Sequence, residues 1–427
     1  MKRLRTLLPL LAGATLAGAA EPPLTLAEAR TLALAAHPRI TVTQLRALVA
    51  QEGTTQAKAG HLPTVALNAT AVESGQQITR ITAGTISNSQ IFDHVGIGAT
   101  LSLLVTDFGR TTSLTQAARQ RAKAAAADAE ATRGQVMLQV NAAFLDVLRA
   151  RAVQAVAAAT LANREAVLTR TGALAQNQLR SELDVRFARV SADEARLLVN
   201  TAEKDVLAAL AVLANLIGEA RLPAGRELAV PAAPGELESD AGALTSRALQ
   251  QRPELTRARA EIEAARASAR AAREARLPTL ALTATAGYTP THDPRFQHQY
   301  SAGALNLNVP LFTGGLYRSR QHEAELQANA ADAASQEQVN LITRDVRLAW
   351  LEAGSARDRI GLTRSLLDNA EAALALARAR FEQGLSSTVE LTQAELSHTS
   401  AAIAHASAEF AYRLRRDILD YQTGALR

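Results

Sequence analysis

Few side chains in this 427-residue chain have the types and spacing that catalysis or metal binding requires. Asp107, Phe108 and Gly109 spell the metal-binding triplet of protein kinases, but no glycine-rich phosphate loop or HRD segment accompanies them. We therefore expect a turn there. His292, Asp293 and His298 could ligate a metal ion, although they fall in an expected loop between strands, and we expect no metal site.

Two further histidines, His398 and His405, are seven residues apart in an expected helix and share the register of Leu391 and Leu419. This spacing favours interhelical packing. The chain has no cysteine, and no Ser-His-Asp set, zinc signature or nucleotide-binding loop occurs in a suitable context. We expect no enzyme, no catalytic residue and no cofactor.

The composition favours long helices over a large globular core. Hydrophobic residues make up 48% of the chain, yet only 3% are aromatic, which suits alanine-rich helices packed closely side by side. The 46 Lys and Arg are interspersed with 41 Asp and Glu, giving a net charge of +5. This mild, scattered excess does not favour nucleic-acid binding.

Residues 1–20 have the features of a signal peptide. Lys2, Arg3 and Arg5 precede an apolar run at 7–16, and small residues at 18–20 predict cleavage before Glu21. The alternative, a membrane anchor, needs a longer apolar stretch than this one. We expect an exported protein.

The rest of the chain contains two similar halves. The segment LPTVALNAT at 62–70 returns as LPTLALTAT at 277–285, an offset of 215 residues. Later pairs, such as Ser181 with Ser387, share an offset of 206, so the first half has nine extra residues between about 70 and 105. A surface loop tolerates such an insertion. We predict structural repeats at 21–218 and 244–427, joined by a linker at 219–243.

Each half contains two strand patterns, predicted at about 62–73 and 95–107, then 277–288 and 300–312. Apolar residues such as Val65 and Leu67 alternate with polar ones such as Asn68. This alternation suits a tilted strand that crosses a bilayer, or a soluble sandwich with one wet face. Aromatic residues at the strand ends favour the bilayer, as an aromatic girdle: Phe92, Phe108, Tyr288, Tyr300 and Phe312. Because four strands cannot close a barrel and open edges are forbidden in lipid, we predict an oligomer.

Very long helices follow the strands. No proline interrupts 111–177 or 316–383, and 67 residues of helix are about 100 Å long. Returning helices are predicted at about 180–217 and 387–422, with apolar residues at seven-residue spacing that include Val206 and Leu213 in the first and Val389 and Leu396 in the second. These positions predict the seam of an antiparallel hairpin.

The motifs LTLAEARTLALAAHPRI (24–40), VPLFTGG (309–315) and GLSSTVELTQAEL (384–396), with the paired strand starts, resemble the TolC outer-membrane efflux family over the whole mature chain. The resemblance implies an α+β membrane protein: a homotrimer with a shared 12-stranded barrel, a periplasmic tunnel of long antiparallel coiled-coil helices and an equatorial element at 219–243. It also implies an outer-membrane location, and a periplasmic adaptor and an inner-membrane pump as partners.

The resemblance further implies that the tunnel narrows at the helix turns, where the family usually carries two aspartates. The matching positions here are Glu390 and Gln393, and the 206-residue offset aligns Asp184 with Glu390. The alternative is that Glu390 is a solvated carboxylate favoured by the helix N-terminus. Adaptor docking is expected at the same turns, at positions Leu179, Ser181, Gly384 and Ser387.

The predicted function is passive export through the outer membrane, as the exit duct of a tripartite efflux or type I secretion system. The competing prediction is a soluble periplasmic coiled-coil adaptor or structural protein. An adaptor would be expected to contain β-rich lipoyl-like halves around its hairpin, and the sequence shows none.

Overall fold

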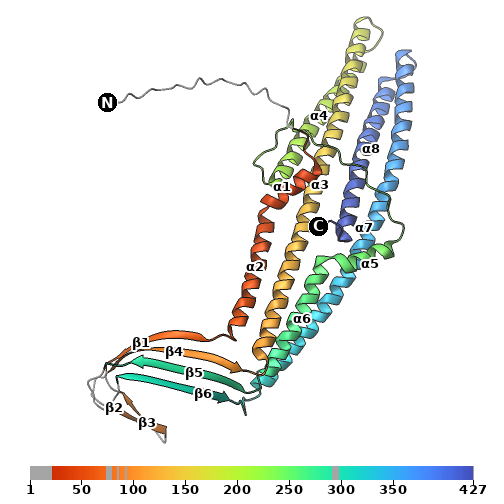
Figure 1. Ribbon diagram of the computed structural model, residues 1–427. Helices are drawn as coiled ribbons and strands as arrows, with labels where there is room; N and C mark the ends of the chain where they lie inside the picture. Colours follow the sequence, from red (N-terminus) through yellow and green to blue (C-terminus); the bar gives the residue numbers. More distant parts are fainter. Residues whose placement is uncertain (1–21, 74–78, 84–85, 92–93, 291–297, 427) are drawn as a thin grey trace, which may run out of the picture. The chain divides into compact units, whose positions relative to one another are not determined.

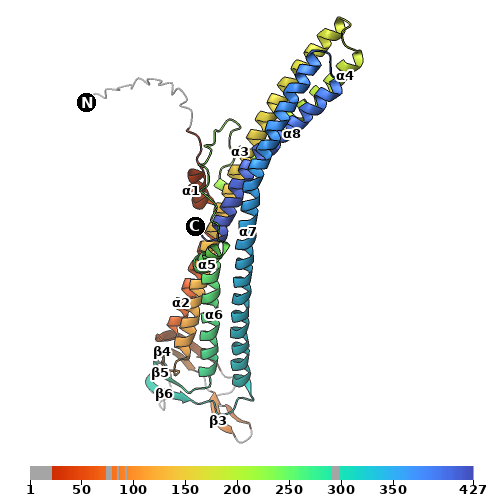
Figure 2. The same ribbon diagram turned by 90° about the vertical axis from the view of Figure 1, so that its right-hand side faces the viewer.

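Secondary structure in the computed structural model alternates between short strands and helices of very different lengths (Figures 1 and 2). The structure describes residues 22–73, 79–83, 86–91, 94–290 and 298–426. The predicted signal peptide, Phe92, His292 and Asp293 lie outside the described residues. No helix within these ranges is both long enough and apolar enough to cross a bilayer.

The chain divides into two compact units, to which α3, α7 and α8 contribute on both sides of the division. We call residues 22–37, 139–236 and 354–416 the hairpin unit, because it holds both helical turns. We call residues 38–138, 237–353 and 417–426 the sheet unit, because it holds all the strands.

The four longest helices form two pairs: α3 (Arg110–Gln176) with α4 (Glu182–Ile217), and α7 (Leu316–Glu382) with α8 (Thr388–Gln422). Both α3 and α7 are 67 residues long, because good helix formers fill them and no proline intervenes. The buried side chains of α4 include Ala192, Val206 and Leu213. In the second predicted seam this chain leaves Val389 and Leu396 60% and 49% exposed, while Ile403 and Phe410 are half-buried.

Four shorter helices complete the helical part: α1 (Leu26–Ala36), α2 (Pro38–Ala59), α5 (Ala241–Gln251) and α6 (Pro253–Glu274). Thr25 and Glu28 form a capping box at the start of α1. Pro38 and Pro253 each occupy the first position of a helix, where a missing N–H costs nothing. These prolines separate α1 from α2 and α5 from α6.

The sheet contains β1 (Thr64–Val72), β4 (His94–Thr106), β5 (Thr279–Tyr288) and β6 (Gln299–Asn308), in the order β1-β4-β5-β6. All neighbours are antiparallel. The register places Leu67 opposite Ala99 and Asn68 opposite Gly98, so one face is apolar and the other polar. Within the described chain, the outer edges of β1 and β6 have no strand partner.

One segment differs from the prediction. We expected a plain loop between the first two strands, but β2 (Thr79–Ala83) and β3 (Ile86–Ile91) form a separate antiparallel hairpin there. Its sequence is rich in Thr, Ser and Asn, which gives little apolar alternation. Backbone pairing, rather than a hydrophobic face, therefore defines this hairpin.

Candidate functional site

The turn between α3 and α4 is a tightly bonded helix junction. After α3 ends, Gln178 adopts a left-handed conformation with φ of 59°, and Leu179 N–H donates to the carbonyl of Leu174 at 2.9 Å. Ser181 then caps α4: its hydroxyl accepts from the Asp184 N–H, and the Asp184 carboxylate accepts from the Ser181 N–H. This capping box fixes the start of α4.

The turn between α7 and α8 uses glycine in the same role. Gly384 has φ of 74°, a conformation that glycine adopts without strain, and Leu385 N–H donates to the carbonyl of Arg380 at 2.8 Å. Ser387 Oγ accepts from the Glu390 N–H at 3.2 Å, which places Glu390 in the first turn of α8. The Glu390 carboxylate lies 3.3 Å from Nε of Arg380.

Three polar contacts join the two turns to each other. Thr388 Oγ1 donates to Asp184 Oδ1 at 2.5 Å. Arg180 donates to the Phe381 carbonyl at 2.9 Å, and its guanidinium lies 4.2 Å from the centre of the Phe381 ring. Arg170 pairs with Glu382 at 2.6 Å across exposed surface.

The Asp184 carboxylate is the centre of this junction. The hydrogen bond from Thr388, followed by those from Ser181, holds the pKa of Asp184 below its ordinary value, because each bond favours the charged form. Asp184 is half-buried, whereas Glu390 and Gln393 are exposed. The structure thus engages Asp184 within its own chain and leaves Glu390 and Gln393 accessible.

The predicted docking residues lie on the surface of these turns. Leu179 is 70% exposed, and Ser181, Gly384 and Ser387 are also exposed. The sequence prediction missed Thr388, which is 2% exposed and bonds to Asp184. A threonine beside two serines gives no sequence signal that distinguishes it.

A buried polar cluster lies in the same unit, where α3, α4, α7 and α8 converge. Arg164 is 4% exposed and donates to the Ser191 carbonyl at 2.9 Å. Glu395 is 5% exposed, with Arg378 at 3.8 Å and one oxygen that has no hydrogen-bond partner. Burial raises the pKa of Glu395, although the charges of Arg378 and Arg164 oppose the shift.

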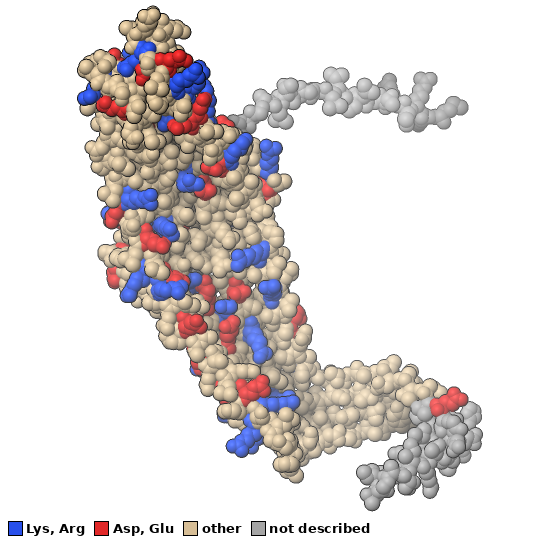
Figure 3. Space-filling model, turned by 180° about the vertical axis from the view of Figure 1, so that it is seen from behind, with Lys and Arg blue, Asp and Glu red and all other residues tan. Residues whose placement is uncertain are grey.

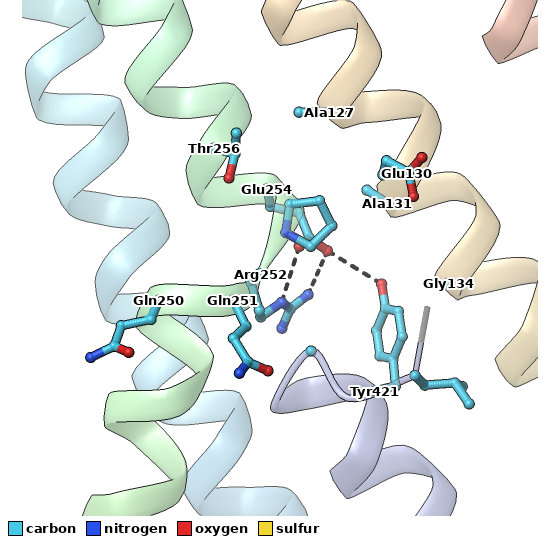
Figure 4. Close-up of a pocket in the computed structure, with 13 residues that line it drawn as sticks. Ala127, Glu130, Ala131, Gly134, Gln250, Gln251, Arg252, Glu254, Thr256 and Tyr421 are labelled. Atoms are coloured by element: carbon cyan, nitrogen blue, oxygen red, sulfur yellow. Dashed lines mark hydrogen bonds and ion pairs between the residues drawn. The ribbon is translucent and has the colours of Figure 1, made fainter.

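The sheet unit contains a cavity of about 370 Å³ beside the end of α8 (Figure 4). On its wall Arg252, 6% exposed, pairs with Glu254 at 2.6 Å and lies 5.2 Å from the centre of the Tyr421 ring. Burial alone would raise the pKa of Glu254, but the hydrogen bonds and charge of Arg252 outweigh it and hold that pKa low. The charge of the buried Arg252 is therefore already neutralised by Glu254, which indicates a structural role for this ion pair.

Among the described girdle residues, Tyr288 and Tyr300 lie at strand ends, and Phe108 and Phe312 lie two and four residues after the ends of β4 and β6. Phe312 and Phe108 are 91% and 55% exposed, and Tyr288 shares the apolar face of β5 with Leu282. Tyr300 instead lies over two glycines of the polar face, Gly98 and Gly287, where a side chain on either would collide with its hydroxyl. Tyr300 is therefore on the opposite face from Tyr288.

Known proteins share both the sequence pattern and this fold. The family model described as outer membrane efflux protein matches residues 29–219 and 244–421. The outer membrane protein OprJ of Pseudomonas aeruginosa is 27% identical over 343 residues, which are 78% of this chain and 70% of OprJ. The toluene efflux pump outer membrane protein TtgF of Pseudomonas putida is 28% identical over 67% of this chain and 60% of TtgF.

Solved structures share the arrangement of strands and helices. The outer-membrane channel OprN superposes with a TM-score of 0.82 at 20% identity, over 93% of this chain and 89% of OprN. The outer membrane protein VceC of Vibrio cholerae superposes with a TM-score of 0.78 at 23% identity, over 93% of this chain and 96% of VceC. At these identities the likeness shows the fold, while the family model covers most of the chain. The resemblance predicted from the sequence is confirmed, and this chain belongs to the outer membrane efflux protein family.

Proposed function

We propose that three copies of this chain assemble into one exit duct, in which their sheets close a 12-stranded barrel across the outer membrane. The observation that carries this proposal is the open sheet: β1 and β6 leave unpaired edges in the described chain, and neither face of the sheet has a buried core. Unpaired edges are not tolerated in lipid, so strands from other copies must cover them.

The duct is passive in this proposal, and a periplasmic adaptor with an inner-membrane pump supplies the energy. The relatives named for toluene or solvent efflux pumps support small apolar molecules as the cargo, rather than polypeptides. A soluble adaptor or rod is not favoured, because the family of this chain consists of outer membrane efflux proteins.

Purified full-length protein tests the proposal in two measurements. Its mass in detergent, corrected for bound detergent, should equal three chains, and it should conduct ions when reconstituted in a planar bilayer. A monomeric mass in mild detergent, or recovery of the folded protein in the soluble fraction of cells, would contradict the duct.

The narrow end of the duct is proposed to carry a ring of three Glu390 carboxylates, one from each copy, with Gln393 beside it. Carboxylates about 5 Å apart repel by roughly 0.8 kcal/mol per pair in water, so the ring attracts cations. Arg380, 3.3 Å from Glu390, weakens this field. Asp184 is proposed to stabilise the position of Glu390, because its hydrogen bond from Thr388 holds the first turn of α8.

Single-channel currents test the ring. A trivalent cation added on the periplasmic side should block the current, and Glu390→Ala should weaken that block by about tenfold, as the loss of a shared cation site implies. Glu182→Ala, which removes an exposed carboxylate from the other turn, is the matched control. Unchanged block in Glu390→Ala would exclude the ring.

The adaptor is proposed to dock on the exposed turns that carry Leu179, Ser181, Gly384 and Ser387. A photo-crosslinking residue placed at Ser387 should capture a periplasmic protein in cells. The same probe at Arg347, an exposed position within the sheet unit, should not capture that protein.

A further inference from the structure

The helix ends beside the sheet carry an unusual concentration of positive charge. They comprise the last seven residues of α2 and α6, the first seven of α3 and α7, and the short connections to the strands. These segments hold two carboxylates and seven Lys or Arg, which we call the basic collar: Lys58, Arg110, Arg270, Arg273, Arg276, Arg318 and Arg320. The excess of five charges equals the formal net charge of the whole chain.

The neighbouring sheet has no charge of either sign. β1, β4, β5 and β6 contain no Lys, Arg, Asp or Glu. Figure 3 shows the same border, with an uncharged sheet surface and the first Lys and Arg where the helices begin. The surface therefore changes from uncharged on the strands to basic at the collar.

The two carboxylates of this region do not neutralise the collar. Asp107 is 6% exposed, and its oxygens accept from Gly109 N–H at 3.3 Å and from Thr111 N–H at 2.7 Å. Glu274 is half-buried beside Gly109 and makes no ion pair with a described residue. Both carboxylates therefore contact the backbone between β4 and α3 instead of pairing with the collar.

Most of the collar lacks a carboxylate partner among the described residues. Arg273 pairs with Glu325 at 3.3 Å, and Arg276 reaches only the amide of Gln321 at 3.5 Å. Lys58, Arg110, Arg318 and Arg320 are exposed, and none has a carboxylate within 4 Å in this part of the chain. Elsewhere on the same helices, exposed arginines such as Arg266 and Arg344 have acidic neighbours.

Exposed apolar side chains lie between the collar and the strands. Leu311 and Phe312 are 92% and 91% exposed, and Leu62 and Phe108 are 62% and 55% exposed. A band of apolar and aromatic residues followed by long basic side chains is the pattern of a membrane interface, where Arg and Lys extend to the headgroups.

We infer that the basic collar binds the phosphate groups of anionic phospholipids in the periplasmic leaflet of the outer membrane. The inference rests on the proposed duct, in which the sheet spans the bilayer. A second copy is a poorer partner for these cations, because symmetric copies would bring an identical basic collar to the same level. Anionic headgroups supply the missing countercharge, with an affinity gain of roughly fivefold per basic side chain.

Electron paramagnetic resonance of spin-labelled lipids tests the inference. Full-length protein is reconstituted in phosphatidylcholine vesicles with a trace of labelled phosphatidylglycerol or labelled phosphatidylcholine, and the motionally restricted fraction of each is measured. Phosphatidylglycerol should associate several-fold more strongly than phosphatidylcholine. This preference, the ratio of the two association constants, should fall towards one at 1 M salt, where charges are screened beyond about 3 Å.

Variants assign the preference to the collar. Arg318→Gln with Arg320→Gln should reduce it at least twofold, while Arg318→Lys with Arg320→Lys should keep it, because charge and not shape is required. The matched control, Arg344→Gln with Arg347→Gln, alters two exposed arginines further along the same helix and should also keep it.

Different failures are distinguishable. Equal restriction of both lipids in the unmodified protein, or an unchanged preference in the Gln pair, overturns the collar and leaves the duct intact. Loss of the trimer in the Gln pair overturns it too, because the collar would then join copies. If neither lipid is restricted, the sheet does not contact lipid and the proposed duct fails as well. The salt dependence of the unmodified protein decides the question even if a variant does not fold.

Discussion

The hairpin unit and the four-stranded sheet with its basic collar differ in how their charges are paired. In the hairpin unit, buried and half-buried charges are matched within the chain: Thr388 bonds to Asp184, and Arg164 and Arg378 surround Glu395. In the sheet unit, β1, β4, β5 and β6 contain no Lys, Arg, Asp or Glu, and most of the basic collar lacks an acidic partner among the described residues.

This difference indicates where each unit finds its stability. Matched charges between helices fix one arrangement of the two helical pairs, because a displaced helix would leave a buried charge alone. In the proposed duct, an uncharged sheet with open edges gains little from its own chain and is stabilised by lipid and by other copies. Substitutions should therefore act on folding of the chain in the first unit and on membrane assembly in the second.

The largest effect is expected from Arg164→Met. Removing one member of a buried charge cluster costs about 3–5 kcal/mol, since Glu395 then lacks the compensating charge of Arg164 on α3. The midpoint of denaturant unfolding, measured on full-length protein in detergent, should fall accordingly.

An exposed ion pair is the control for this prediction. Arg186 and Glu182 pair at 3.1 Å on the surface, with side chains 67% and 83% exposed, so Arg186→Met should change the free energy of unfolding by less than about 1 kcal/mol. Equal effects of Arg164→Met and Arg186→Met would show that burial of the cluster does not matter.

In the sheet unit, Leu67→Arg should cost about 2–4 kcal/mol, because it places a charge on the apolar face in the middle of β1. Asn68→Arg changes the neighbouring residue on the polar face and should be nearly neutral. Heat-modifiable migration of the assembled protein on gels measures both. If Asn68→Arg is the more harmful, the lipid-facing side has been assigned the wrong way round.

Much of this fold was predictable because its signals are local. The proline-free run from residue 111 predicted a helix of about 67 residues, and α3 has 67. Alternation predicted the apolar and polar faces around Leu67 and Asn68, which the register reproduces. Such signals depend only on the spacing of side chains along one element. The β2–β3 hairpin lacked that alternation and was missed.

The candidate site was predicted less well, because it depends on contacts between distant elements. The motif of Ser181 and Asp184 could have indicated a capping box, but nothing local shows that Thr388, 204 residues further on, bonds to Asp184. The apolar seam predicted for α8 is only partly buried within this chain. The buried stripe of this helix includes Thr388, Glu395 and Thr399, which are polar, while Val389 and Leu396 are exposed.

The smallest expected effect concerns the pH dependence of stability. Burial holds the pKa of Glu395 above its ordinary 4.5, so the folded protein binds that proton more tightly than the unfolded chain does. The stability that Glu395 contributes is therefore fully present below 4.5 and is lost as the pH rises through the higher folded pKa. Other ionisable groups lie nearby: His398 is 3.9 Å from Glu371, and Glu194 is 3.3 Å from Arg164.

Glu395→Gln isolates the contribution of the one carboxyl, because it imitates the protonated form at every pH. The variant should match the unmodified protein near pH 4.5 and be more stable by up to about 1 kcal/mol at pH 7.5, provided the amide keeps the packing. Unfolding midpoints at several pH values, compared with Glu371→Gln as the exposed control, measure the difference. If Glu395→Gln is instead less stable at pH 7.5, the ionised carboxylate holds Arg164 and Arg378 more strongly than burial penalises it, and the cluster is an ion pair that stabilises the four helices.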